Sequence, residues 1–191
     1  MNNMEPDVER LRAARDMLKV DPDRGLVQLQ NLTEAGSAMA PLCLGWAYQN
    51  GDGLPKDEGK AEKFYQLALS RGEASASYYL GHFYSKIGRH DDSSLAYKAG
   101  VDIGYCPSMY CLAMNILSED QTNEKMTKAR QLLELASSKG QVFAQRSLGS
   151  LCMHGKFGIS RIPFGVYLTV KSIIFGAVIA MRNHQDERLL A

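Results

Sequence analysis

The sequence lacks an excess of charge of either sign. Its 191 residues include 22 Lys and Arg and 21 Asp and Glu, which gives a formal net charge of +1, and the two signs are interspersed. Proteins that bind nucleic acid normally carry a basic surface for the phosphates. We therefore expect no nucleic-acid partner. Residues 1–10 are polar and charged rather than apolar, so we also expect no secretory signal.

Cysteine is scarce, and none of it forms a C-x-x-C pair. The four cysteines are Cys43, Cys106, Cys111 and Cys152. They lack the spacing of a metal-binding or disulfide framework, so we interpret them as reduced thiols that pack as small apolar side chains. Thiols of this kind are typical of a cytoplasmic protein.

Catalytic and metal-binding motifs are also missing. Cys152 and His154 are two positions apart, so on a helix their side chains point in different directions, and no second ligand pair completes a zinc site. The run 90–92, His-Asp-Asp, precedes a helical pattern, where acidic residues cap the helix and complement its dipole. The run 51–53, Gly-Asp-Gly, is too short for a phosphate-binding loop and follows a helix. We predict no enzymatic activity, no metal and no cofactor.

What the sequence does contain is an internal repeat. A glycine returns at intervals of 36, 32, 36 and 36 residues, as Gly36, Gly72, Gly104, Gly140 and Gly176. Before Gly72 lie two apolar stripes at helical spacing, the first with Ala40, Leu44 and Tyr48 and the second with Ala61, Tyr65 and Ala68. Gly51, Gly53 and Pro55 separate the stripes and predict a turn. Each period therefore predicts two short helices in a hairpin.

The same residue types recur at the matching positions of the later repeats. Leu44 returns as Leu80, Leu112 and Leu148, and Ala61 returns as Ser93, Ala129 and Gly165. This pattern resembles the Sel-1-like repeat family, whose leucine-glycine pair, tyrosine, Gly-x-Gly turn and alanine-rich second helix are all present in residues 40–72. The next periods keep the leucine and lose part of the turn. The resemblance implies an all-α fold, a right-handed α/α superhelix of about five hairpins, and a role as a non-enzymatic adaptor that assembles protein complexes.

The repeat divides the chain into segments. Residues 1–36 match it only weakly and are expected to form a divergent N-terminal capping hairpin, because the end of a solenoid would otherwise expose its core. The repeats are expected at 37–72, 73–104, 105–140 and 141–181, followed by a tail at 182–191. Compact chains of this family are common in bacteria, so the resemblance implies a bacterial source, and the reduced cysteines predict a cytoplasmic location.

One long apolar run stands apart from the rest. Residues 162–181, from Ile162 to Met181, contain one charge, Lys171. This length suffices to span a bilayer, so one alternative is a membrane-tethered factor in envelope or polysaccharide assembly. Small residues favour a packed solenoid helix instead, because Gly165, Thr169, Ser172 and Gly176 share one face and fall on the repeat's own small-residue columns. A third alternative is that the run docks on a partner or on a second copy of the chain.

A binding surface is expected on the first helix of each hairpin. Such helices usually line the concave side of a solenoid. The positions opposite the core stripe are Leu42, Trp46, Gln49, Tyr78, His82, Tyr110, Met114 and Arg146. Aromatic and methionine side chains are enriched at interaction hot spots. We predict a groove that binds a peptide or protein surface, mainly through Trp46 and Tyr78; the alternative is that some of these side chains only pack against the neighbouring first helix.

Overall fold

The computed structural model describes residues 8–119 and 122–182, and all regular elements in these ranges are helices. The helices are α1 (Val8–Val20), α2 (Pro22–Glu34), α3 (Met39–Asn50), α4 (Glu58–Ser70), α5 (Ser75–Lys86), α6 (His90–Asp102), α7 (Cys106–Glu119), α8 (Asn123–Ser138), α9 (Val142–Met153) and α10 (Ile162–Arg182). A 3₁₀ turn, η1 (Ile159–Arg161), precedes α10. The all-α prediction is confirmed. The expected tail lies outside the described residues, apart from Arg182.

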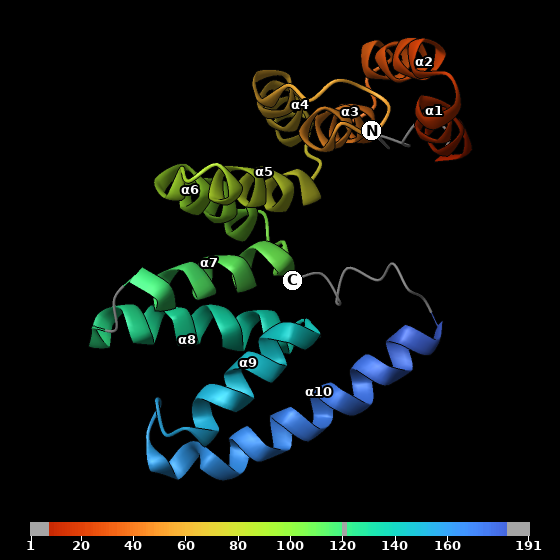
Figure 1. Ribbon diagram of the computed structural model, residues 1–191. Helices are drawn as coiled ribbons and strands as arrows, with labels where there is room; N and C mark the ends of the chain where they lie inside the picture. The colour runs from red at the N-terminus through yellow and green to blue at the C-terminus, as the bar shows by residue number, and fades with distance from the viewer. Residues whose placement is uncertain (1–7, 120–121, 183–191) are drawn as a thin grey trace. The chain divides into compact units, whose positions relative to one another are not determined.

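The helices form two compact units, residues 1–96 and 97–191, and the division falls inside α6. In the first unit α1 pairs with α2 and α3 with α4, and α5 packs on α4 (Figure 1). In the second unit α7 pairs with α8 and α9 with α10 (Figure 1). Four helix pairs, α1–α2, α3–α4, α7–α8 and α9–α10, therefore form hairpins of the kind that the repeat predicts.

Glycines end four of the second helices, as the repeat predicts. Gly36, Gly72, Gly104 and Gly140 follow α2, α4, α6 and α8 with φ between 83° and 95°. At the end of α4 the Gly72 N–H donates to the Leu69 carbonyl, and the next N–H, that of Glu73, donates to the Ala68 carbonyl. Side chains other than glycine are strained at such φ values, so glycine closes the helix at little cost.

Gly176 is the exception. It lies inside α10, which continues to Arg182, so it does not close a helix as the glycines of the other four periods do. The residues after it, Ala-Val-Ile-Ala-Met, carry no turn signal and continue the helix. A Cβ at Gly176 would lie 3.3 Å from Cγ1 of Val142 on α9, so this glycine serves close packing.

Small side chains allow the two helices of a hairpin to approach each other. Ala40 on α3 and Ala61 and Ala68 on α4 have no exposed surface. A Cβ at Gly45 would lie 2.7 Å from the ring of Tyr65, which is itself fully buried. The predicted columns are therefore the core of the hairpin, where close packing supplies most of the stability of helices this short.

The small-residue face of α10 packs on α9, as the repeat columns indicate. A Cβ at Gly165 would lie 2.6 Å from the Gly149 carbonyl oxygen, and Ser172 is buried. Among the residues that the structure describes, no helix has both the length and the apolarity needed to cross a membrane. This finding includes α10, the helix formed by the apolar run 162–181.

Candidate functional site

The predicted contacts on α3 differ in accessibility. Trp46 has 45% of its surface exposed, whereas Leu42 has only 9%. Gln49 is half-buried, and its Oε1 accepts a hydrogen bond from the Tyr65 hydroxyl of α4. Of the three, Trp46 offers the largest apolar contact area, and Leu42 belongs largely to the core.

On α5 the two predicted residues lie side by side. His82 is exposed, and its ring lies 6.3 Å from that of Tyr78, which is only 8% exposed. Packing explains the burial of Tyr78, because its ring also meets Tyr79 edge-on at 5.3 Å. Tyr78 therefore supports its neighbours and presents little surface of its own.

Tyr79 joins α3 to α5, and the sequence pattern did not single it out. Its ring meets Trp46 edge-on, with centroids 5.6 Å apart and an interplanar angle of 81°, and it stacks on Tyr65 at 6.3 Å. Tyr79 immediately precedes the leucine column, in the position that Cys43 has in the previous repeat, and this change from small to aromatic was the available signal. We call Trp46, Tyr78, Tyr79 and His82 the aromatic cluster.

The predicted contacts in the second unit are less aromatic. Tyr110 on α7 is half-buried and lies 6.3 Å from the ring of Phe143 on α9. Met114 is 38% exposed, and Arg146 on α9 is exposed. These side chains form a mixed surface rather than a ring cluster.

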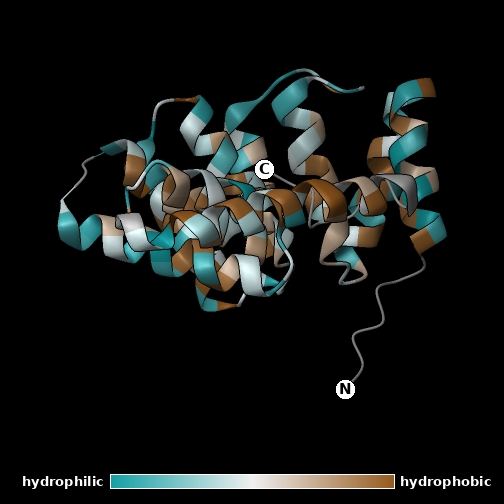
Figure 2. Ribbon diagram, turned by 90° about the horizontal axis from the view of Figure 1, so that it is seen from below, coloured by the Kyte–Doolittle hydropathy of each residue, from teal (hydrophilic) through white to brown (hydrophobic). Residues whose placement is uncertain are grey.

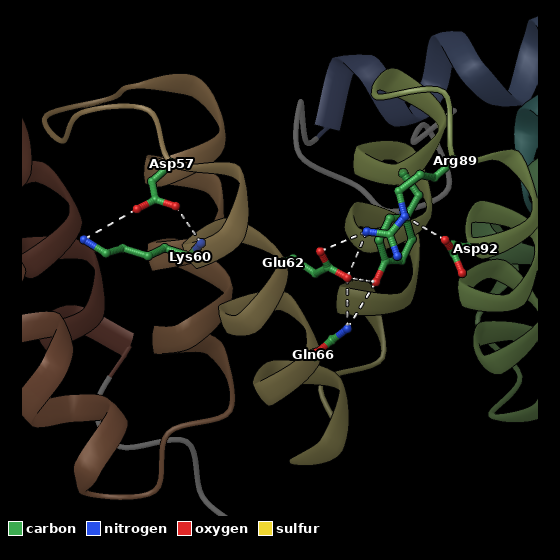
Figure 3. Close-up of polar contacts among 7 residues, drawn as sticks. Asp57, Lys60, Glu62, Gln66, Arg89 and Asp92 are labelled. Atoms are coloured by element: carbon green, nitrogen blue, oxygen red, sulfur yellow. Dashed lines mark hydrogen bonds and ion pairs between the residues drawn. The ribbon is translucent and has the colours of Figure 1, made fainter.

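A polar network fixes α5 and the start of α6 against α4 (Figure 3). The Tyr84 hydroxyl donates to Glu62 Oε1 at 2.7 Å and accepts from Gln66 Nε2 at 3.1 Å. Arg89 pairs with Glu62 Oε2 at 3.0 Å and with Asp92 Oδ2 at 2.7 Å, and its guanidinium lies 4.5 Å from the centre of the Tyr84 ring. The pKa of Tyr84 is raised, mainly because the phenol is buried and secondly because it donates a hydrogen bond to Glu62. These donors and acceptors bond to one another, so the network orients α5, which carries Tyr78, Tyr79 and His82, against α4.

The described residues show no arrangement suited to covalent chemistry or metal binding. Burial raises the pKa of the Cys111 thiol to about 12, and burial also raises that of Cys152, so neither is an activated nucleophile. The Nδ1 of His154 lies 2.7 Å from the Ser150 carbonyl oxygen, so this nitrogen is engaged by its own helix. No group of three or more His, Cys, Asp or Glu side chains converges within the described ranges.

Comparison with known sequences identifies the repeat. The Sel1 repeat family matches residues 38–73 and 120–141. A curated relative, a putative sel1-like repeat-containing protein, L21, of Acanthamoeba polyphaga mimivirus, is 28% identical over 152 residues, which are 74% of this chain. The match covers 28% of that relative, so the chain spans about a quarter of its length.

Solved structures agree on the fold. A Sel1 repeat protein from Oxalobacter formigenes aligns with a TM-score of 0.69 and 20% identity, covering 86% of this chain and 73% of that one. The protective antigen c5321 of uropathogenic Escherichia coli, which displays the SLR fold, aligns with a TM-score of 0.71 and 23% identity, covering 87% of this chain and 38% of that one. The chain is therefore similar to Sel-1-like repeat proteins in sequence over the two matched segments, and similar to them in fold over most of its length.

Proposed function

We propose that this chain is a non-enzymatic scaffold that binds a peptide or a protein surface through the aromatic cluster on α3 and α5. The observation that carries the proposal is that Trp46 is both exposed and held in place. Its exposed surface fraction is 45%, and the Tyr79 ring packs edge-on against it with ring centroids 5.6 Å apart. A large ring that is already positioned loses little conformational freedom when a partner covers it. Tryptophan and tyrosine are also the residues most enriched at binding hot spots.

The surroundings of Trp46 favour a polypeptide partner. His82 and Gln49 place polar groups beside an apolar ring, which is the mixture of anchor and hydrogen-bonding groups that protein interfaces use. Sel1 repeats generally serve as protein-interaction scaffolds, and this supports the same conclusion. In the second unit, Tyr110, Met114 and Arg146 form a separate candidate surface that we propose makes weaker contacts, because it lacks an exposed, ring-supported tryptophan.

We also propose a cytoplasmic location. All four cysteines are thiols rather than disulfides: Cys152 is buried, and Cys43, Cys106 and Cys111 are half-buried. A protein with this many reduced thiols is typical of a reducing compartment.

Selection from a display library of random peptides tests the proposal. Peptides enriched on the wild-type chain are expected to lose binding to Trp46→Ala. Leu95→Ala is the matched control, because Leu95 is 64% exposed on α6 and lies outside the aromatic cluster. Circular dichroism of all three proteins establishes that each is folded. Peptides that bind Trp46→Ala and the wild type equally would place the interaction elsewhere and contradict the proposal.

A further inference from the structure

The face of α10 that points away from α9 is apolar along the length of the helix. Seven large side chains there are between 40% and 63% exposed: Phe164, Val166, Tyr167, Val170, Ile173, Ile174 and Val178. Four of them, with Lys171 and Phe175, line a shallow groove. In Figure 2, where brown marks hydrophobic residues, much of the α10 ribbon is brown. Contiguous apolar surface of this kind on a folded chain marks an interaction site.

In its hairpin, α10 corresponds to the second helix, as α4 and α8 do in earlier hairpins. Aligning α10 with α4 and α8 divides the positions on its exposed face into two sets. The first set points to solvent in the earlier repeats. It is occupied by Lys60 and Lys63 in α4 and by Lys128 and Gln131 in α8, all exposed and polar. The corresponding residues of α10 are Phe164 and Tyr167.

The second set contacts the hairpin that follows. In α4 it consists of Glu62 and Gln66, which bond to Tyr84 of α5. The corresponding residues of α10 are Val166 and Val170. A further hairpin stacked on α10 in the manner of the internal repeats would cover this second set and leave Phe164 and Tyr167 in water. The occupant must therefore cover both sets.

We propose that the occupant is the same face of a second copy of this chain, so that two α10 helices pack against each other in a closed dimer. A helix of 21 residues is about 30 Å long. Side chains of this size and number, at about half exposure, present on the order of 500 Å² of apolar surface in each copy. Two copies would bury about 1,000 Å², which reaches the size of a specific interface.

The rest of the described chain offers no other complementary surface. The remaining exposed large apolar side chains occur singly or in small groups: Val8, Val20, Val27, Trp46, Leu95, Ile103, Met114 and Leu135. The outer face of α1 carries the exposed charges Arg12, Arg15 and Asp16, so head-to-tail stacking of α10 on α1 would bury charged groups against apolar ones. An apolar patch whose best match is itself gives a two-fold interface.

The charges on α10 permit this pairing. Between Ile162 and Met181 the only charged side chain is Lys171, and its Nζ lies 5.9 Å from the centre of the Tyr167 ring. The long side chain can keep its ammonium at the edge of the interface while its methylene groups remain in apolar contact.

Light scattering coupled to size-exclusion chromatography over a concentration series tests the dimer. We expect the wild-type chain to have the mass of two copies and the double variant Ile173→Lys/Ile174→Lys to have half that mass. Both substitutions are on exposed positions of α10, so far-ultraviolet circular dichroism should show unchanged helix content. Leu95→Lys is the control, because Leu95 is exposed among Asp91, Lys98 and Asp102, and this variant should remain dimeric.

Three results would overturn the proposal. One is a wild-type chain with the mass of a single copy at every concentration. The second is a folded double variant that keeps the mass of a dimer. The third is a monomeric wild type that sediments with phosphatidylcholine vesicles while the double variant does not, which would assign the face to lipid. None of these results bears on peptide binding at Trp46, so this proposal and the scaffold proposal fail independently.

Discussion

Trp46 of α3 stands edge-on to Tyr79 of α5, with ring centroids 5.6 Å apart and ring planes at 81°. The contact links two successive first helices, and it fixes an exposed ring in one orientation. Edge-to-face pairs of this kind contribute about 0.5–1.5 kcal/mol beyond the area that they bury. The contact between Trp46 and Tyr79 therefore has two roles that can be tested separately. It stabilises the packing of α3 on α5, and it holds the Trp46 indole in one orientation at the surface.

Replacement of Tyr79 by leucine tests the second role. The substitution keeps an apolar side chain but removes the ring that orients Trp46. We expect a loss of stability of about 1 kcal/mol, measured by urea unfolding, and weaker binding of a selected peptide even though Trp46 is intact. Unchanged peptide affinity in Tyr79→Leu would show that orientation of the indole is unimportant.

The contact between α9 and α10 gives a sharper stability prediction. A Cβ at Gly149 would lie 2.5 Å from Thr169 Oγ1 and 2.9 Å from the Gly165 carbonyl oxygen. Gly149→Ala should therefore destabilise the chain by about 1–3 kcal/mol through overpacking, as measured by thermal or urea unfolding.

Gly59→Ala is the control for that measurement. Gly59 lies in the first turn of α4 and is exposed, and a Cβ there would meet only Asp57 Oδ1, at an ordinary contact distance of 3.5 Å. Alanine favours the helix over glycine by up to about 1 kcal/mol, so this variant should be unchanged or slightly more stable. Equal destabilisation by both substitutions would contradict the close approach at Gly149.

The polar network predicts a dependence of stability on alkaline pH. The pKa of Tyr84 is raised in the folded chain, first by burial and then by its hydrogen bond to Glu62. A raised pKa means that the folded state holds the phenol proton more tightly than the unfolded state, so this contribution is complete below the ordinary tyrosine pKa of about 10 and is lost as the pH rises above it. Urea unfolding should show a steeper fall in stability above about pH 10 for the wild type than for Tyr84→Phe. Parallel curves would contradict this role for the phenol.

The cysteines predict a two-stage reaction with a thiol reagent. In denaturant without reductant, all four should react, because all four are thiols. In the folded chain at neutral pH, Cys111 and Cys152 should react slowly, because burial raises both pKa values and lowers the thiolate fraction. Fewer than four reactive thiols after denaturation would contradict the proposal of a reducing compartment.

The sequence predicted the helical hairpins well, because their signals are local. Gly72 closes a helix through its own backbone freedom, and Ala61 and Ala68 mark the core through their size. The same reasoning failed at Gly176, where the glycine follows the 36-residue period but lies against Val142 inside a helix that continues. Spacing alone cannot distinguish a glycine needed for a turn from one needed for close approach.

The candidate site was harder to predict. The sequence singled out Trp46 because a large aromatic side chain stands opposite the core stripe, and this residue is exposed. Tyr78 occupies the position of Leu42 in the next first helix, and it is only 8% exposed because Tyr79 and His82 pack against it. Whether such a side chain is covered depends on contacts between different repeats, which helical periodicity does not contain.

The affinity of one selected peptide for the wild type and for Trp46→Ala, measured by isothermal titration calorimetry, tests the scaffold proposal most directly. A hot spot contributes about 2 kcal/mol or more, so we predict that Trp46→Ala raises the Kd at least tenfold, while Leu95→Ala leaves it unchanged. Equal Kd values for the wild type and a folded Trp46→Ala would contradict the proposal that the aromatic cluster is the binding surface.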